Sequence, residues 1–110
     1  MKMVILMYLR EDERCVDRML AAGGVGTFSR LPIEGHGPGA RGWYGEVAPY
    51  DSRMVMAVVE PEIASGILSA VEECRGVADP GHPIRAVQLD VEHVASCLCE
   101  PTGESTPTEE

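Results

Sequence analysis

The sequence has few aromatic residues, few basic residues and no long apolar run. Aromatic residues make up 5% of the 110 residues, so aliphatic side chains and methionine must fill the core. Nine Lys and Arg stand against eighteen Asp and Glu, and this acidity argues against direct binding to nucleic acid or an anionic membrane. No apolar run approaches the ~18 residues of a membrane span, and charged residues follow Leu9 without a signal-peptide cleavage site. We therefore expect one soluble, cytoplasmic domain.

The four cysteines do not have the spacing typical of the disulfide frameworks of small secreted proteins, so we expect reduced thiols.

Hydrophobic patterning predicts the order strand, helix, strand, strand, helix, strand. Residues 3–9 and 53–59 are apolar runs typical of buried strands, whereas residues 25–33 and 84–91 alternate as edge strands do. The first helix, capped by Asp12 or Glu11, is predicted to end at Gly23-Gly24, and the second to begin at Pro61. The predicted buried positions are Val16, Met19, Leu20 and Gly23 in the first helix, and Ile63, Ile67, Ala70, Val71 and Cys74 in the second.

This order predicts an α+β, ferredoxin-like βαββαβ sandwich, with two helices on one face of a four-stranded antiparallel sheet. We place the domain at residues 1–95 and an acidic, disordered tail at residues 96–110. Both middle strands are apolar on their two sides, yet two helices cover only one face of such a sheet. We therefore expect a symmetric homo-oligomer to cover the second face; a monomer with an open apolar sheet is the alternative.

Residues 34–45 contain five glycines directly after the second predicted strand. Glycine allows positive φ and close backbone approach, so N–H groups of this segment can cradle an anion beside the Arg41 guanidinium. A flexible connection without chemistry is the alternative interpretation.

The glycine-rich run resembles the base of the T-loop in PII-like signalling proteins, and the similarity in element order spans residues 3–93. It implies a homotrimer whose sheets face inward. Small effectors, often adenine nucleotides, would bind between subunits and reshape residues 34–45, which dock on a target protein such as a transporter or enzyme. The family's second nucleotide-contacting loop falls at Gly76 to Arg85. The candidate ligand-binding residues are therefore Gly35, Gly37, Gly39, Arg41, Gly42, Arg75, Gly81, His82 and Arg85.

Two features depart from the family pattern. Tyr44 and Tyr50 lie too close to the strands to take the role of the modifiable tyrosine in longer T-loops. No Lys or Arg follows Arg85, whereas nitrogen-sensing members carry arginines after the last strand. The shortage of cations weakens ATP as the ligand more than it weakens the fold.

His93, Cys97 and Cys99 support an alternative function, the binding of copper or zinc, as in CutA-type proteins that share the trimeric build. The two cysteines could instead form a labile disulfide, as in the redox-sensing tails of some PII-like bicarbonate-transport regulators, or be inert.

A third alternative is a small ferredoxin-like isomerase or monooxygenase. It needs a polar residue between sheet and helices, where the central strands offer only Tyr8, and no serine lies in a nucleophile-elbow motif. We therefore predict that the protein is not an enzyme.

Overall fold

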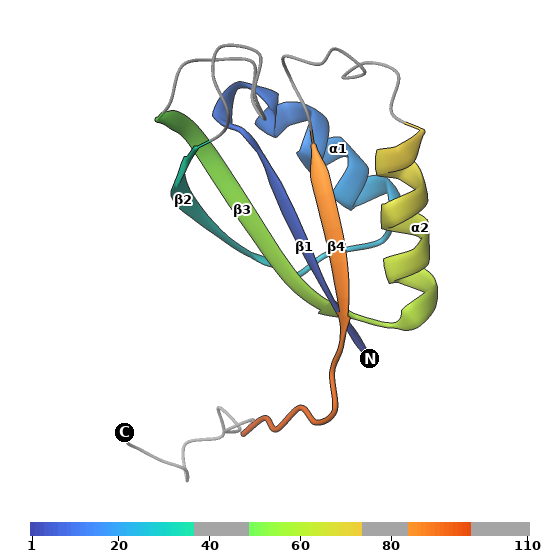
Figure 1. Ribbon diagram of the computed structural model, residues 1–110. Coiled ribbons are helices and arrows are strands. Elements are labelled where there is room, and N and C mark those ends of the chain that lie inside the picture. Colours follow the sequence, from blue (N-terminus) through green and yellow to red (C-terminus); the bar gives the residue numbers. More distant parts are fainter. Residues whose placement is uncertain (37–48, 74–83, 98–110) are drawn as a thin grey trace, which may run out of the picture.

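The chain folds into a four-stranded antiparallel sheet with two helices (Figure 1). The computed structural model describes residues 1–36, 49–73 and 84–97. In chain order the elements are β1 (Lys2–Leu9), a 3-10 turn η1 (Arg10–Asp12), α1 (Glu13–Ala22), β2 (Ser29–Gly35), β3 (Tyr50–Val59), α2 (Pro61–Glu72) and β4 (Arg85–Asp90). The strand order β2-β3-β1-β4 places β1 and β3 in the middle. This confirms the predicted ferredoxin-like α+β fold.

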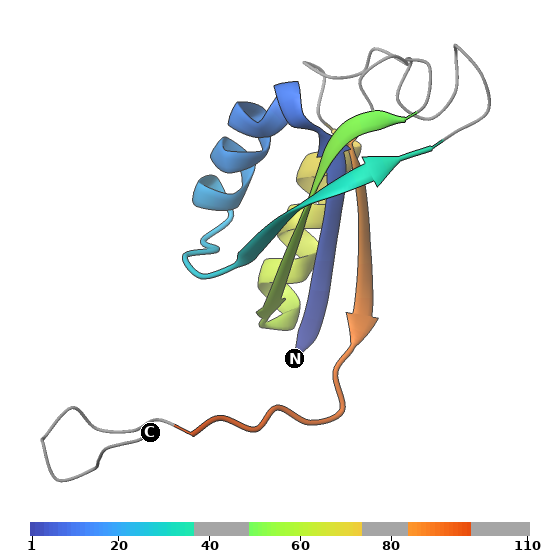
Figure 2. The same ribbon diagram turned by 90° about the vertical axis from the view of Figure 1, so that its left-hand side faces the viewer.

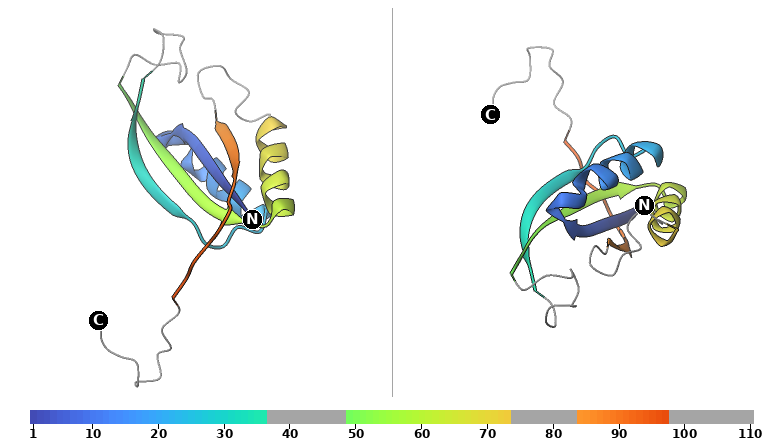
Figure 3. Two further views of the ribbon diagram at one scale, coloured as in Figure 1. Left: turned by 60° about the horizontal axis from the view of Figure 1, so that its bottom comes forward. Right: turned by 90° about the horizontal axis from the view of Figure 1, so that it is seen from above.

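One face of the sheet packs against both helices. Successive side chains of a strand point to opposite faces, and Val4, Leu6 and Tyr8 of β1 are buried on the face that carries the helices. Val55 and Ala57 lie opposite Leu6 and Val4 on β3. The helices complete this core with Val16 and Leu20 from α1 and Ala64 and Ile67 from α2. Figures 2 and 3 show both helices on the same side of the sheet.

The other face, which we call the open face, is also apolar. The strand register places on it Met3, Ile5, Met7, Leu31, Ile33, Met54, Met56, Val58, Val87 and Leu89. Among the described residues no helix covers this face (Figure 2). Val58 is 39% exposed, Val87 42% and Leu89 51%, so the face presents a continuous apolar surface. The prediction that both middle strands are apolar on two sides is thus confirmed.

The helix ends follow the sequence signals with one exception. α1 stops at Gly23, the next residue Gly24 has a positive φ of 86°, and the Val25 N–H then donates to the Leu20 carbonyl at 2.9 Å. Pro61 occupies the first turn of α2, as predicted. Asp12 occupies the N-cap position of α1, as predicted, but its side chain makes no capping hydrogen bond. The turn η1, Arg10–Asp12, leads directly into the helix.

The strand predictions were right in number and wrong at several ends. The strand expected at 25–33 is β2, which begins only at Ser29, because Val25 packs in the core and pairing with β3 starts at Ser29 opposite Met56. β3 begins at Tyr50, before the expected residue 53, because its ladder with β2 continues to that point. Cys74, predicted to lie on the buried side of α2, falls outside the described residues. None of the helices in the described part is long and apolar enough to cross a membrane.

The turn after α1 yields a stability prediction with an internal control. Gly24→Ala should lower the free energy of unfolding by about 1–2 kcal/mol, because a Cβ is disfavoured at positive φ. Gly26→Ala should be nearly neutral, since no atom lies within 4 Å of a Cβ added there and its φ is not in the left-handed range. Urea unfolding of both variants measures the difference; equal stabilities would contradict the assignment of the turn.

Candidate functional site

One end of the sheet carries the attachment points of both predicted ligand-binding segments. β1 and β2 finish at this end, and β3 and β4 begin there (Figure 1). Gly35, the last residue of β2, is buried and pairs with Tyr50. Arg85, the first residue of β4, is exposed and lies opposite Met7. The two segments therefore attach to a shared, rigid platform.

Within one chain the two attachment points are well separated. Gly35 belongs to β2 and Arg85 to β4, and the strands β3 and β1 lie between them. Neighbouring strands are about 4.8 Å apart, so three spacings amount to roughly 14 Å. The described part of a single chain therefore does not bring these two predicted ligand-binding residues together.

The remaining predicted residues divide into those outside and those inside the described structure. Outside it lie Gly37, Gly39, Arg41, Gly42, Arg75, Gly81, His82 and Cys99. His93 and Cys97 are both exposed, in the segment that leaves β4 and runs away from the sheet (Figure 1). Within residues 1–36, 49–73 and 84–97, no group of three or more His, Cys, Asp or Glu side chains is placed to hold a metal ion.

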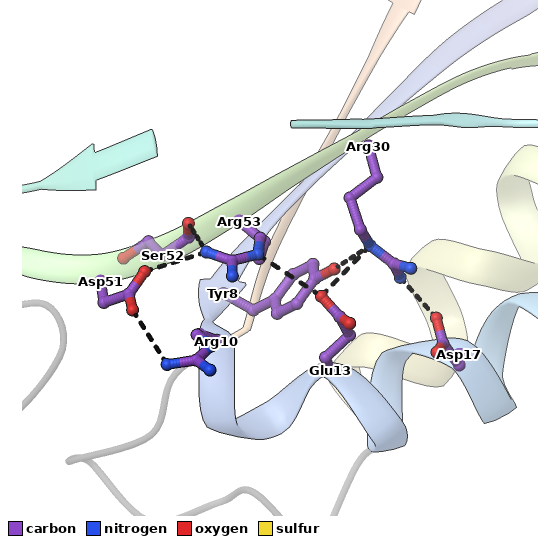
Figure 4. A network of polar contacts seen from close by, with 8 residues as sticks. All are labelled: Tyr8, Arg10, Glu13, Asp17, Arg30, Asp51, Ser52 and Arg53. Carbon is purple, nitrogen blue, oxygen red and sulfur yellow. Dashed lines mark hydrogen bonds and ion pairs between the residues drawn. The ribbon is translucent and has the colours of Figure 1, made fainter. Parts of the chain in front are cut away.

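A network of polar side chains lies beside this end of the sheet, on the face that carries the helices (Figure 4). Arg30 of β2 is at its centre. The Arg30 Nε donates to the buried Tyr8 hydroxyl at 2.9 Å, and its Nη2 donates to the Asp17 carboxylate on α1. The guanidinium also lies over the Phe28 ring, 5.2 Å from the centroid. Arg30 thus ties the edge strand β2 to both the central strand β1 and helix α1.

Glu13, the first residue of α1, extends the network to β3. Its Oε1 lies 3.4 Å from the Arg30 Nε and 3.7 Å from the Arg53 Nε. This oxygen is buried and accepts no hydrogen bond, because the Arg30 Nε donates to the Tyr8 hydroxyl and the Arg53 Nε is too far away at 3.7 Å. The attraction is therefore mainly coulombic, and two cations share one carboxylate.

The network continues to the start of β3. Arg53 Nη1 donates to the Asp51 carboxylate at 2.9 Å and to the Ser52 carbonyl at 3.1 Å. The other oxygen of Asp51 accepts from Arg10 at 3.3 Å. Three guanidiniums thus face three carboxylates, those of Glu13, Asp17 and Asp51, so the network carries no net charge. Its chemical role is to hold α1 and the β2–β3 pair in fixed positions.

Burial raises the pKa of Tyr8 above its ordinary value, because the ionised phenolate would lose its hydration. The hydrogen bond and positive charge of Arg30 act in the opposite direction, and burial prevails. Tyr8 therefore stays protonated in the physiological range and accepts the hydrogen bond from Arg30 as a neutral phenol.

Sequence reasoning identified Tyr8 as the polar residue of the central strands and missed its partners. Arg30 and Arg53 are charged residues whose strand positions place them on the face that carries the helices. The alternation of side chains between the two faces of a strand could have placed both arginines on this face. Using it for Arg30 required the correct start of β2, which the sequence prediction set several residues too early.

Comparisons with known proteins establish the fold. A search of protein-family models finds no match, and no curated protein matches. Solved structures do match. A putative PII-like signalling protein of Thermus thermophilus, TTHA0516, is 20% identical with a TM-score of 0.60, covering 82% of this chain and 85% of that one.

A second similar structure is CPII of Thiomonas intermedia K12, a nitrogen regulatory PII-like protein that was solved bound to ADP, AMP and bicarbonate. It is 14% identical with a TM-score of 0.58, and the match covers 86% of this chain and 94% of CPII. Its apo form matches with a TM-score of 0.59 at 12% identity. This chain therefore has the ferredoxin-like fold found in PII-like signalling proteins.

The polar network predicts unequal effects for two arginines. Arg30→Met should lower the free energy of unfolding by about 1–3 kcal/mol, since it leaves the buried Tyr8 hydroxyl and the Asp17 carboxylate without their donor and removes one of the two cations beside Glu13. Arg10→Met should cost less than about 0.5 kcal/mol, because its ion pair is exposed. Arg30→Met should also move the pKa of Tyr8 further up, as seen in the phenolate absorbance during alkaline titration. Equal costs for the two variants would contradict this account.

Proposed function

We propose that the protein is a PII-like regulator, and not an enzyme, that binds a small anionic effector between subunits and controls a partner protein. An adenine nucleotide is the first candidate for the effector. The observation that carries the proposal is the apolar open face on a fold that PII-like signalling proteins share. Residues 1–95 would form the regulatory domain and residues 96–110 a tail, and the protein would act in the cytoplasm.

The apolar open face supports a homotrimer in which the sheets of the three copies face inward. Exposed apolar surfaces of this extent mark interaction sites in soluble proteins, and a symmetric assembly would bury the same face of every copy. Such an assembly would also set the β2–β3 end of one copy beside the β4 end of another. The roughly 14 Å that separates Gly35 from Arg85 within one chain would then be bridged between two chains.

The anionic effector is supported by the residues attached to this end of the sheet. Arg41, Arg75 and Arg85 would supply positive charge, and the glycine N–H groups near Gly35 would supply further donors. ADP, AMP and bicarbonate, the molecules bound to CPII, are all anions. Effector binding would change how residues 34–45 contact a target protein, which is a common form of switching.

The assembly is tested by a charged residue on the open face. Wild-type protein should sediment with three times the mass of one chain at micromolar concentration. Met56→Glu should shift it to the monomer, because Met56 lies centrally on this face, opposite Ile5 and Ser29, and an unpaired carboxylate is costly to bury.

Ser65→Glu is the matched control, because Ser65 is an exposed residue of α2 on the other side of the sheet. This variant should keep the wild-type mass. A well-folded wild-type monomer at micromolar concentration would remove the intersubunit site and with it the proposed function.

Effector binding is tested by calorimetry with ATP, ADP, AMP and cyclic AMP. At least one should bind, and Arg85→Ala should weaken it by about 10-fold or more, the range for loss of one charge-assisted hydrogen bond. Arg41→Ala should act in the same way. Lys2→Ala is the control, since it removes an equal charge at the opposite end of β1. Absence of heat from all four nucleotides at millimolar concentration would overturn the nucleotide assignment.

A further inference from the structure

A groove runs between the two helices on the side of the molecule away from the open face. It has a volume of about 480 Å³ and is lined by Cys15, Met19 and Ala22 of α1 and by Gly66, Ile67 and Ala70 of α2. The two helices are inclined to each other (Figures 1 and 3). Because the sheet lies between groove and open face, assembly through the open face leaves the groove accessible.

Gly66 is an unexpected residue in the groove. It lies in the interior of α2, where glycine is less favourable than alanine. Nothing in the described structure requires its small size, since a Cβ added there would have no atom within 4 Å. Gly23 is different, because an added Cβ would lie 2.5 Å from Ile67 Cδ1. The packing of this chain accounts for Gly23, whereas Gly66 points to close approach by another molecule.

The two rims of the groove carry opposite charge. Arg14 and Arg18 are exposed on α1, one turn apart, and Arg18 lines the groove. Glu62 of α2 and Glu73, the residue directly after α2, are both exposed. They do not line the groove itself, but their spacing of four residues before and seven after Gly66 corresponds to the same side of a helix. Among the described residues none of these four side chains has an ion-pair partner. Arg14 and Arg18 are like charges one turn apart, which destabilise a helix, so an acidic flank from outside would relieve their repulsion. Glu62 and Glu73 are eleven residues apart and would each be free to pair with a basic residue of a partner.

We propose that this groove binds an amphipathic helix of a partner protein, with acidic residues along one flank and basic residues along the other. The acidic flank would lie along Arg14 and Arg18, and the basic flank along Glu62 and Glu73. Small residues in the groove let the backbone of the bound helix approach closely, as in the tightest helix pairs. The surface lies apart from the proposed effector site and adds a second contact with a partner.

A helix fits this groove better than an extended peptide does. An extended peptide gains affinity by pairing its backbone with a sheet edge. The groove walls are helices whose backbone groups already bond within each helix, so a strand would find no partners there. A bound helix forms its backbone hydrogen bonds internally, so it needs only an apolar stripe and charged flanks to bind.

The test uses the full-length protein and a fluorescent synthetic helix of about 15 residues, the length at which an isolated helix becomes marginally stable. The helix carries a Leu/Ala stripe, Glu along one flank and Lys along the other. Anisotropy should show saturable binding. Gly66→Leu should weaken it at least 10-fold by filling the groove, while raising the melting temperature by about 5 °C because a helix-favouring residue replaces glycine. Loss of binding in a more stable protein separates a blocked site from misfolding.

Two controls complete the experiment. Ser65→Leu adds the same side chain on another side of α2 and should leave the affinity unchanged. Arg14→Glu combined with Arg18→Glu makes both rims acidic, so this variant should prefer a peptide with Lys on both flanks. Binding that survives Gly66→Leu, or no saturable binding, overturns the proposal. A change in sedimenting mass on Gly66→Leu also overturns it, since a second copy would then fill the groove. The sedimenting mass of the Met56→Glu variant tests the proposed homotrimer, and its outcome does not depend on whether the groove binds a helix.

Discussion

The structure depends on a sheet that is apolar on two faces and covered by helices on one. β1 and β3 place Leu6 and Val55 beneath the helices, and they place Ile5 and Met56 on the open face. Burial of the first set accounts for the fold of one chain. The second set leaves an apolar surface that water disfavours. In the proposed homotrimer this surface would be buried between copies, and the intersubunit effector site would follow from which face the copies share.

The polar network supplies the rigidity that such an arrangement requires. β2 is an edge strand, paired on one side only, and edge strands without further contacts are free to separate or twist. Arg30 holds β2 to Tyr8 and Asp17, and Arg53 holds β3 to the first residue of α1. The last residue of β2 is Gly35, where the glycine-rich segment begins. The strand from which that segment leaves is thus held to α1 by the Arg30–Asp17 ion pair.

Sequence patterning was sufficient for the element order, the two central strands and the two-sided apolar sheet, because burial repeats with the period of each element. It misplaced the start of β2, since Val25 and Phe28 are apolar residues of a connection that packs against the core. The network was missed because Arg30, Glu13 and Arg53 come from three elements far apart in the chain. The groove was missed for the same reason, and only the separation of α1 and α2 reveals that Gly66 faces open space.

The distribution of the nine basic residues explains how an acidic chain could bind an anion. Arg10, Arg30 and Arg53 are neutralised within the network, and Lys2 pairs with Asp90 at the opposite end of the sheet. Arg14 and Arg18 lie on the outer side of α1. The remaining three, Arg41, Arg75 and Arg85, belong to the segments attached at one end of the sheet. Charges beyond about 8–10 Å are largely screened in physiological salt, so the overall charge of −9 matters little there. In the proposed homotrimer, arginines contributed by two copies would raise the positive charge near a bound anion.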